Sequence, residues 1–292
     1  MKHKLYMIVA MAIFGTIGGF KEFIPLKPGE IALYRAVLAA AVILVALLLT
    51  RQKLPLKAIK KSLPLLILSG AAMGFNWILL FAAYDNTTIP IATLSYYFAP
   101  VLVTVLTPVL FREKLSTKQW VCSLMATVGI VLIMNVGGLS DGKNHLLGIG
   151  FGIGAAVLYA AVVLLNKGIR DVSGIHRTLI QFLAAIVVML PYVLLTGFTS
   201  EPVDTRGFVY MLIIGLVHTG FAYCLYFSAV KELSGQKVAI MSYIDPLVAI
   251  VISYVWLHEA PPTPLQIVSG VMILGFTLLN EIELKPKKKE EV

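Results

Sequence analysis

The sequence has 292 residues, of which 59% are hydrophobic and only 13% are charged, and its mean hydropathy is +0.89. A soluble domain of this length could not cover so much apolar surface with so few charges, so the composition excludes an ordinary globular protein. The net charge of +9 fits basic loops beside anionic lipid and requires no nucleic-acid partner. An all-α polytopic membrane protein is therefore predicted.

Ten apolar stretches follow one another along the chain, and each is long enough to cross the roughly 30 Å hydrocarbon core as a helix. A helix satisfies its own backbone hydrogen bonds there, as the absence of water requires. The first stretch is predicted to be an uncleaved span, because no convincing cleavage site follows it and nine more stretches come after it. The predicted helices cover residues 5–23, 30–50, 62–84, 88–111, 117–136, 146–167, 175–196, 207–229, 235–257 and 264–282.

The sequence also matches itself at a constant offset of 146 residues. This offset predicts two units, residues 1–140 and 141–292, with five helices each. Because five is an odd number, the second unit enters the membrane in the opposite sense, which makes an inverted repeat of the kind common in secondary transporters. The matching pairs include Lys21 and Lys167, Gly74 and Gly220, Phe81 and Phe227, Tyr97 and Tyr243, Pro100 and Pro246, Glu113 and Glu259, and Gly129 and Gly275.

The positions of the basic residues predict the orientation. Of the 24 Lys and Arg residues, 19 fall at one set of helix ends, which includes both termini. Basic residues are concentrated on the cytoplasmic side of membrane proteins, so both termini are predicted to be cytoplasmic. The other set of helix ends holds only Lys21, Lys27, Arg35, Lys143 and Arg206.

Specific residues carry a family resemblance. The first helix has the pair Phe14-Gly15 and ends near Lys21, and Arg35 lies early in the second helix. Segments 94–116 and 240–262 each run from a proline-containing helix to a glutamate. These features resemble EamA-type proteins of the drug/metabolite transporter superfamily over essentially the whole chain.

The resemblance implies a ten-helix bundle in two inverted halves. In that arrangement the first four helices of each half surround a central cavity, and helices 5 and 10 are peripheral. It also implies transport of a small metabolite, since family members mostly move such compounds and many export amino acids or related molecules.

Two ionisable residues have no equivalent in the other copy. Asp245 corresponds to Ala99, and His218 corresponds to Ala72. An ionisable group at mid-depth in a membrane is costly and is a functional candidate by default. Asp245 is interpreted either as a site for a substrate ammonium or a coupling proton, or as a protonated or paired structural group. His218 is interpreted either as a titrating group of the same site or as a neutral histidine bonded between helices.

Three basic residues near helix ends offer the opposite charge. Lys21 and Arg35 are predicted to lie toward the outer side, with Glu22 and Glu30 as candidate partners, and Lys167 toward the inner side. Each of them either extends to the lipid headgroups or points inward and holds a carboxylate near a gate. Arg35 is the best functional candidate of the three, because a glutamine replaces it in the second copy.

Amide and aromatic residues complete the candidate site. An apolar pocket with a few converging polar groups suits a small organic solute, although aromatic residues also serve in packing and at membrane interfaces. Pro100 and Pro246 are predicted to kink their helices as hinges, or to serve in packing, and Glu113 and Glu259 to be structural. The amide and aromatic candidates are Asn76, Trp77, Tyr96, Tyr97, Tyr159, Tyr223 and Tyr243.

The leading interpretation is a multi-pass secondary transporter of the bacterial plasma membrane that exports amino acids, aromatic ones included, or related amine-bearing solutes by alternating access. Coupling to protons is left open. One alternative is an importer or facilitator of another metabolite, such as a cation or a carboxylate. A second is a non-transporting membrane protein, either an assembly protein or an intramembrane enzyme. The chain contains no motif for a metal, a nucleotide or a nucleophile, so no enzymatic activity and no cofactor are predicted.

Overall fold

The structure is a computed structural model that describes residues 2–111, 115–133, 143–169, 171–172, 174–200, 202–230, 232–233 and 241–282. Within these ranges every regular element is a helix. Seven helical segments are long and apolar enough to cross a membrane, and three shorter apolar helices accompany them, in agreement with the predicted all-α polytopic membrane protein. The long segments are Lys2–Lys21, Pro28–Leu49, Leu56–Asn86, Ile89–Thr107, His145–Lys167, Gly174–Thr196 and Thr205–Ala229, and the shorter ones are Thr117–Leu132, Ile244–Val255 and Pro264–Asn280.

Several segments are divided into consecutive helices by a local change of backbone geometry. Most observed boundaries lie within a few residues of the predicted ones, but the helix predicted to begin at residue 62 already begins at Leu56. The elements are α1 (Lys2–Gly15), α2 (Ile17–Lys21), α3 (Pro28–Leu49), α4 (Leu56–Asn86), α5 (Ile89–Tyr96), α6 (Ala99–Phe111), α7 (Thr117–Ile133), α8 (His145–Lys167), α9 (Gly174–Thr196), α10 (Thr205–Leu212), the π-helix η1 (Ile213–Phe221), α11 (Ala222–Val230), α13 (Ile244–Val255), α14 (Pro264–Gly270), the π-helix η2 (Val271–Gly275) and α15 (Phe276–Glu281).

Side chains that bond to the first turn begin several helices. Asn144 accepts a hydrogen bond from the Leu147 amide at the start of α8, 3.2 Å away. Asp204 caps α10 in the same way through the amide of Gly207, at 2.7 Å. Such caps satisfy backbone donors that have no partner inside the helix, and each is worth about 1 kcal/mol.

The helix is interrupted just before each of the two matched prolines, where kinks in the middle of a helix were predicted. The helix α5 ends at Tyr96 and α6 begins at Ala99, so Pro100 lies in the first turn of α6. Pro246 likewise lies in the first turn of α13, which begins at Ile244. A proline fits that position because its missing N–H would have no partner inside the helix. The structure therefore replaces each predicted kink with an interruption just before the proline.

The helices pack in a pattern that repeats between the two halves of the chain. The helix α1 packs against α11 and α13, and α8 packs against α4 and α5. Numbered among the ten apolar segments given above, the first therefore contacts the eighth and ninth, and the sixth contacts the third and fourth. If each segment is replaced by the one five places along the chain, the first set of contacts becomes the second.

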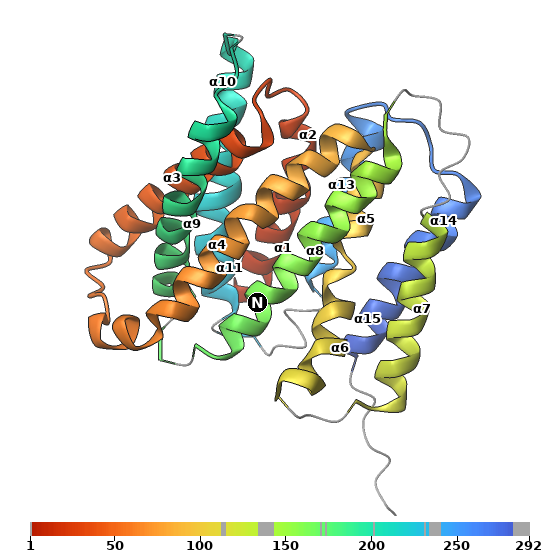
Figure 1. The fold of residues 1–292 in the computed structure, drawn as a ribbon, viewed down its shortest axis with the longest axis horizontal. Coiled ribbons are helices and arrows are strands. Elements are labelled where there is room, and N and C mark those ends of the chain that lie inside the picture. Colours follow the sequence, from red (N-terminus) through yellow and green to blue (C-terminus); the bar gives the residue numbers. More distant parts are fainter. Residues whose placement is uncertain are drawn as a thin grey trace, which may run out of the picture.

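One pair of segments lies to the side of this bundle (Figure 1). The segment α14–η2–α15 packs mainly along α7, and the close approach occurs at Gly129, where an added Cβ would lie 2.9 Å from both Ile273 and Met272. Contacts from α7 to α5 and α6 are fewer. The pair is therefore attached to the bundle along a narrow edge.

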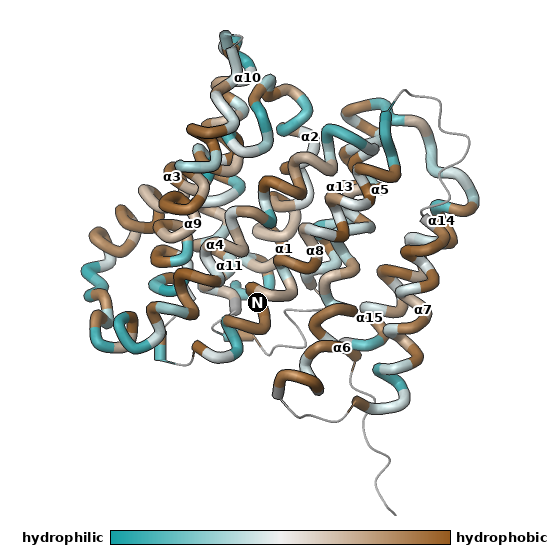
Figure 2. Tube along the Cα trace, in the orientation of Figure 1, coloured by the Kyte–Doolittle hydropathy of each residue, from teal (hydrophilic) through white to brown (hydrophobic). Residues whose placement is uncertain are grey.

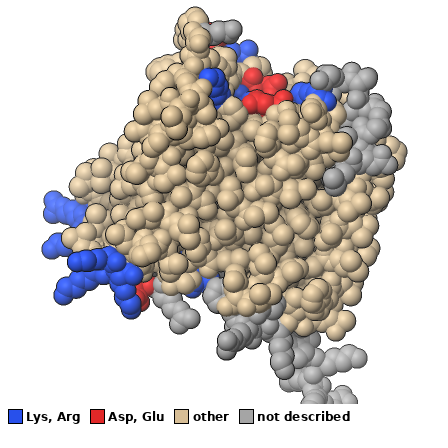
Figure 3. Space-filling model, viewed as in Figure 1, with Lys and Arg blue, Asp and Glu red and all other residues tan. Residues whose placement is uncertain are grey.

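Hydropathy varies along the height of the molecule (Figure 2). Hydrophobic residues fill the middle, and hydrophilic residues gather near both ends. At one end, which we call the basic end, Figure 3 shows a cluster of Lys and Arg side chains. Its exposed members come from the α3–α4 connection and the start of α4 and are Arg51, Lys53, Lys57, Lys60 and Lys61.

Candidate functional site

A basic and an acidic residue lie among aromatic rings inside the bundle. The basic residue is Arg35 of α3, whose side chain is almost fully buried. The acidic residue is Asp245, in the first turn of α13, which is half-buried. Among the described residues neither forms a salt bridge. Together with the rings around them, these two residues are called the central site.

Arg35 is held by one hydrogen bond and two aromatic faces. Its Nε donates to the Thr219 hydroxyl of η1 at 3.1 Å. The guanidinium carbon lies 4.2 Å from the ring centroid of Trp77 and 5.4 Å from that of Phe81, both on α4. Stacking of this kind stabilises a desolvated guanidinium without neutralising it. The terminal nitrogens form no hydrogen bond with any described residue, so they keep donors for another group.

Asp245 is bonded to the opposite half of the chain. The hydroxyl of Tyr97 lies 3.2 Å from Asp245 Oδ2 and 3.0 Å from the carbonyl oxygen of Ser242. Pro246 has no N–H, so the Ser242 carbonyl four residues before it lacks its usual helical donor, and Tyr97 supplies one. A hydroxyl has one proton to donate. All three groups are satisfied together when Asp245 is protonated and donates to Tyr97, which then donates to Ser242.

Several phenols lie near both residues. Tyr84, Tyr96 and Tyr223 are each close enough to interact electrostatically with both Arg35 and Asp245. The arginine and the carboxyl group therefore share these three neighbours. Tyr97 and Tyr159 also interact with Asp245, and Tyr159 of α8 is partly exposed.

The rings around the central site form two groups of contacting rings. The pairs Trp77–Phe182 and Phe182–Tyr223 have centroids 5.4 Å and 5.5 Å apart. Tyr96 and Tyr159 are 5.6 Å apart, and their contact joins α5 to α8. Edge and tilted contacts at these distances are favourable for aromatic pairs. Phe14 lies 5.2 Å from Tyr223 in the first group, and in the second Tyr243 lies 6.0 Å from its own repeat counterpart, Tyr97.

Asn76 supports the site from behind. Its side chain is buried, and Nδ2 donates to the carbonyl oxygen of Ala155 in α8 at 2.6 Å. It also interacts with the phenol of Tyr96. Asn76 therefore ties α4 to α8 and positions the ring of Tyr96.

His218 lies at the junction of two irregular segments. Its Nδ1 faces the carbonyl oxygen of Ile213 at 3.2 Å, and its Nε2 lies 2.7 Å from the hydroxyl of Thr16, at the break between α1 and α2. A carbonyl only accepts, so Nδ1 carries a proton. The Thr16 hydroxyl bonds both to Nε2 and to the carbonyl oxygen of Ile13, which is 2.8 Å away. His218 is therefore bonded between helices through both ring nitrogens. No hydrogen bond to Asp245 is present among the described residues.

The two lysines of the predicted set lie apart from the central site. Lys21 is buried at the end of α2 and forms an ion pair with Asp85, near the end of α4, where Glu22 and Glu30 were expected as partners. Glu30 instead accepts hydrogen bonds from the Lys27 amide and from Thr199. Lys167 is exposed at the end of α8.

The Lys21–Asp85 ion pair is expected to show an asymmetric response to mutation. The Lys21 side chain is 6% exposed and that of Asp85 is 39% exposed. Asp85→Asn leaves a buried ammonium without its anion and should lower the free energy of unfolding by about 1–3 kcal/mol, less than for a fully buried pair. Lys21→Met should cost less, because Asp85 keeps water. Denaturant titration in mixed micelles measures both, and a greater loss for Lys21→Met would contradict the assignment.

Sequence reasoning missed three residues of this region. Thr219 bonds to Arg35, Phe182 packs on Trp77, and Asp85 pairs with Lys21. In each case the two residues lie far apart in the sequence, so only the fold brings them together. Asp85 did carry a signal, since it directly follows the apolar run of residues 62–84. Of the residues discussed above, Glu113 lies outside the described part of the chain.

Comparison with known proteins places the sequence among transporters. The model of the EamA-like transporter family matches residues 1–135 and 146–281. An uncharacterized transporter of Bacillus subtilis, YxxF, is 30% identical over 283 residues, which span 96% of this chain and 90% of that protein. A probable terminal-alkyne amino-acid exporter of Streptantibioticus cattleyicolor is 27% identical over 236 residues, 78% of this chain and 77% of that one.

A solved crystal structure shows the same fold. Its TM-score with this structure is 0.68 at 16% sequence identity, and the match covers 95% of this chain and 96% of the other. At this identity the similarity concerns the fold alone.

Proposed function

Because the chain belongs to the EamA-like transporter family, we propose that it is a secondary transporter of the bacterial plasma membrane that exports a small zwitterionic metabolite, with amino acids as the leading class. Transport would proceed by alternating access, without nucleotide hydrolysis. The central site would hold the solute between the two halves of the chain.

An inverted repeat of ten helices with cytoplasmic termini is part of this proposal. Three observations support it: the constant offset of 146 residues, the family match to two separate segments, and the packing pattern that survives exchange of the halves. The basic end would face the cytoplasm, and the concentration of Lys and Arg there supports this orientation. Rocking of one half against the other would then expose the central site to either side.

The observation that carries the substrate class is the separation of charges in the central site. Arg35 and Asp245 interact with the same three phenols, Tyr84, Tyr96 and Tyr223, yet form no ion pair with each other. A molecule with a carboxylate at one end and an ammonium at the other would bridge them. Its carboxylate would accept from the terminal nitrogens of Arg35, and its ammonium would face Asp245.

The aromatic rings suit the rest of such a molecule. Trp77, Tyr96, Tyr159 and Tyr223 offer apolar faces with polar edges, which accommodate an aromatic or aliphatic side chain. The named activity of the Streptantibioticus relative, amino-acid export, supports the same class of solute.

Proton coupling would act through Asp245. In the protonated state Asp245 donates to the Tyr97 hydroxyl and that hydroxyl donates to the Ser242 carbonyl, so these hydrogen bonds are complete within the protein. In the ionised state Tyr97 cannot serve both acceptors, and an arriving ammonium would stabilise the carboxylate. Substrate and proton would therefore compete for Asp245, which is the basis of an exchange cycle.

The test is thermal stabilisation of the purified protein by three matched solutes: an amino acid, its decarboxylated amine and its deaminated acid. A ligand at 100 times its Kd adds about 2.7 kcal/mol to the folded state. The amino acid should stabilise the wild type most, and Asp245→Asn should abolish its advantage over the deaminated acid. If no solute acts, or if the variant responds as the wild type does, the zwitterion site is rejected.

Direction requires a second measurement. Accumulation of the labelled solute in inside-out vesicles under a proton gradient would indicate export. Uptake into right-side-out vesicles under an inward proton gradient would indicate the alternative, an importer on the same fold.

A further inference from the structure

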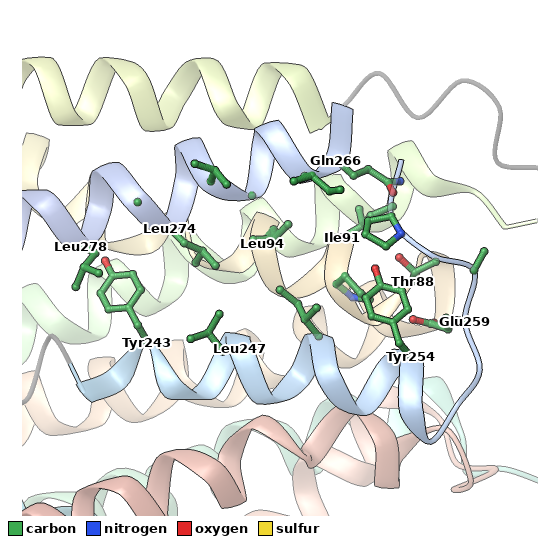
Figure 4. A pocket seen from close by; sticks show the side chains of 18 of the residues that line it. Thr88, Ile91, Leu94, Tyr243, Leu247, Tyr254, Glu259, Gln266, Leu274 and Leu278 are labelled. Carbon is green, nitrogen blue, oxygen red and sulfur yellow. The ribbon is translucent and has the colours of Figure 1, made fainter. Parts of the chain in front are cut away.

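A cavity lies outside the central site, between α13 and the segment α14–η2–α15 (Figure 4). Its volume is about 860 Å³, and α5 closes its inner wall. It exists because α14–η2–α15 packs on α7 and leaves the face of α13 uncovered. We call it the lateral crevice.

The lateral crevice is apolar along most of its length and opens sideways. Leu94, Leu274 and Leu278 line it, and so do Leu247 and Val271, whose side chains are 56% and 65% exposed on the outer surface. These residues belong to helices of the apolar middle of the molecule (Figure 2). An apolar space open to the hydrocarbon core excludes water and is filled by lipid chains.

The length of the lateral crevice matches one lipid leaflet. It extends from Gln266 at one end to Leu278 at the other, as Figure 4 shows. Twelve residues of helix rise by about 18 Å at 1.5 Å per residue. One leaflet contributes half of the roughly 30 Å hydrocarbon core. A single extended acyl chain would therefore occupy the crevice from end to end.

Polar groups are concentrated at the Gln266 end. Glu259 and Lys143 both line the crevice there and interact electrostatically with each other, and Thr88 lies beside them. Glu259 accepts from the Ile89 amide at 3.4 Å and from the Ser253 hydroxyl. Burial raises the pKa of the Glu259 carboxyl, which disfavours its charged form. A cation bound nearby would oppose this effect and stabilise the carboxylate. The charges suit a headgroup that carries a phosphate and an ammonium.

We propose that the lateral crevice binds one phospholipid with an ethanolamine headgroup. One acyl chain lies between α13 and α14–η2–α15, the ammonium faces Glu259 and the phosphate faces Lys143. The opposite end of the crevice is lined by Tyr243, whose ring contacts Tyr97, the partner of Asp245. The ring of Tyr243 would therefore lie between the lipid and Tyr97. This site does not depend on the identity of the transported solute.

Native mass spectrometry of the delipidated protein, titrated with phosphatidylethanolamine or phosphatidylglycerol, tests the proposal. The wild type should retain one phosphatidylethanolamine in preference to phosphatidylglycerol. Gly270→Leu fills the crevice, because a Cβ at Gly270 points at Leu94 from 3.4 Å, and should weaken binding at least tenfold. Gly150→Leu is the matched control, since Gly150 is exposed on α8 with nothing within 4 Å of its added Cβ, and should bind as the wild type does.

Two further measurements distinguish the contribution of the headgroup to binding from that of the acyl chain. Glu259→Gln should retain lipid binding but lose the preference for phosphatidylethanolamine. Glycerophosphoethanolamine, which has the headgroup but no chain, should not bind. Unchanged lipid binding by Gly270→Leu, or a wild type that does not prefer phosphatidylethanolamine, would overturn the proposal. Melting temperatures of the variants show whether they fold. If Glu259→Gln does not fold, the comparison of Gly270→Leu with Gly150→Leu still tests whether the crevice binds the lipid.

Discussion

Replacement of Arg35 by glutamine is expected to reduce transport of the proposed amino-acid substrate by roughly two to four orders of magnitude. The guanidinium is buried between Trp77 and Phe81, and its terminal nitrogens form no hydrogen bond within the described chain. A substrate carboxylate that loses this partner is left buried and unpaired, at a cost of about 3–5 kcal/mol. At 1.4 kcal/mol per tenfold change in affinity, that cost gives the expected reduction. Arg35→Lys should recover only part of the activity, because an ammonium lacks the planar pair of donors.

Transport of a labelled amino acid into proteoliposomes measures this effect. Lys167→Gln is the matched control, because Lys167 is the exposed basic residue of the predicted set and lies apart from the central site. It should transport as the wild type does. If Arg35→Gln keeps its activity for the amino acid and loses stability alone, Arg35 is a packing residue and the carboxylate binds elsewhere.

Gly15→Ala is expected to destabilise the folded protein and to slow transport together. A Cβ at this position would lie 2.4 Å from the backbone carbonyl oxygen of Asp245 and 2.7 Å from the Cβ of Val248. Because the nearest atom belongs to the backbone, α1 and α13 must separate to admit the methyl group. Overpacking of this kind costs about 1–3 kcal/mol, and we expect a value near the upper end. The displaced helix carries Asp245, so the central site changes with it.

Gly150→Ala provides the reference for this prediction. No atom lies within 4 Å of an added Cβ there, and alanine is the better helix former by about 0.5–1 kcal/mol. Denaturant titration should show Gly150→Ala at or above the wild type and Gly15→Ala clearly below it. Equal stability of the two variants would mean that α1 and α13 do not approach closely at Gly15.

The comparison of the two copies selected three ionisable residues that the structure buries or half-buries. Asp245, His218 and Arg35 were singled out because their repeat counterparts differ in charge, and the structure buries Arg35 and His218 and half-buries Asp245. The sequence pattern alone did not show that the three side chains have different surroundings. Arg35 faces a group of rings and His218 is already bonded on both nitrogens, and this difference follows from contacts about 200 residues apart in the chain, such as Thr16 with His218.

The partners of the charged residues illustrate the same limit. Glu22 and Glu30 were natural candidates because they lie close to Lys21 in sequence, yet Asp85 is the partner in space. Helix direction and rotation decide which side chains meet at a helix end, and no local pattern encodes them.

By itself, the sequence determined the helical membrane class and most of the helix boundaries to within a few residues. A spanning helix needs a long apolar run, and such a run can be read directly from the sequence. The sequence also indicated the duplication, through a constant offset. Only the tertiary structure decided that the helix is interrupted before each matched proline and that Tyr97 bonds to Asp245 and Ser242. The crevice between α13 and α14–η2–α15 was likewise visible only in the structure. These features depend on how helices from both halves rotate and pack against each other, which composition and periodicity leave open.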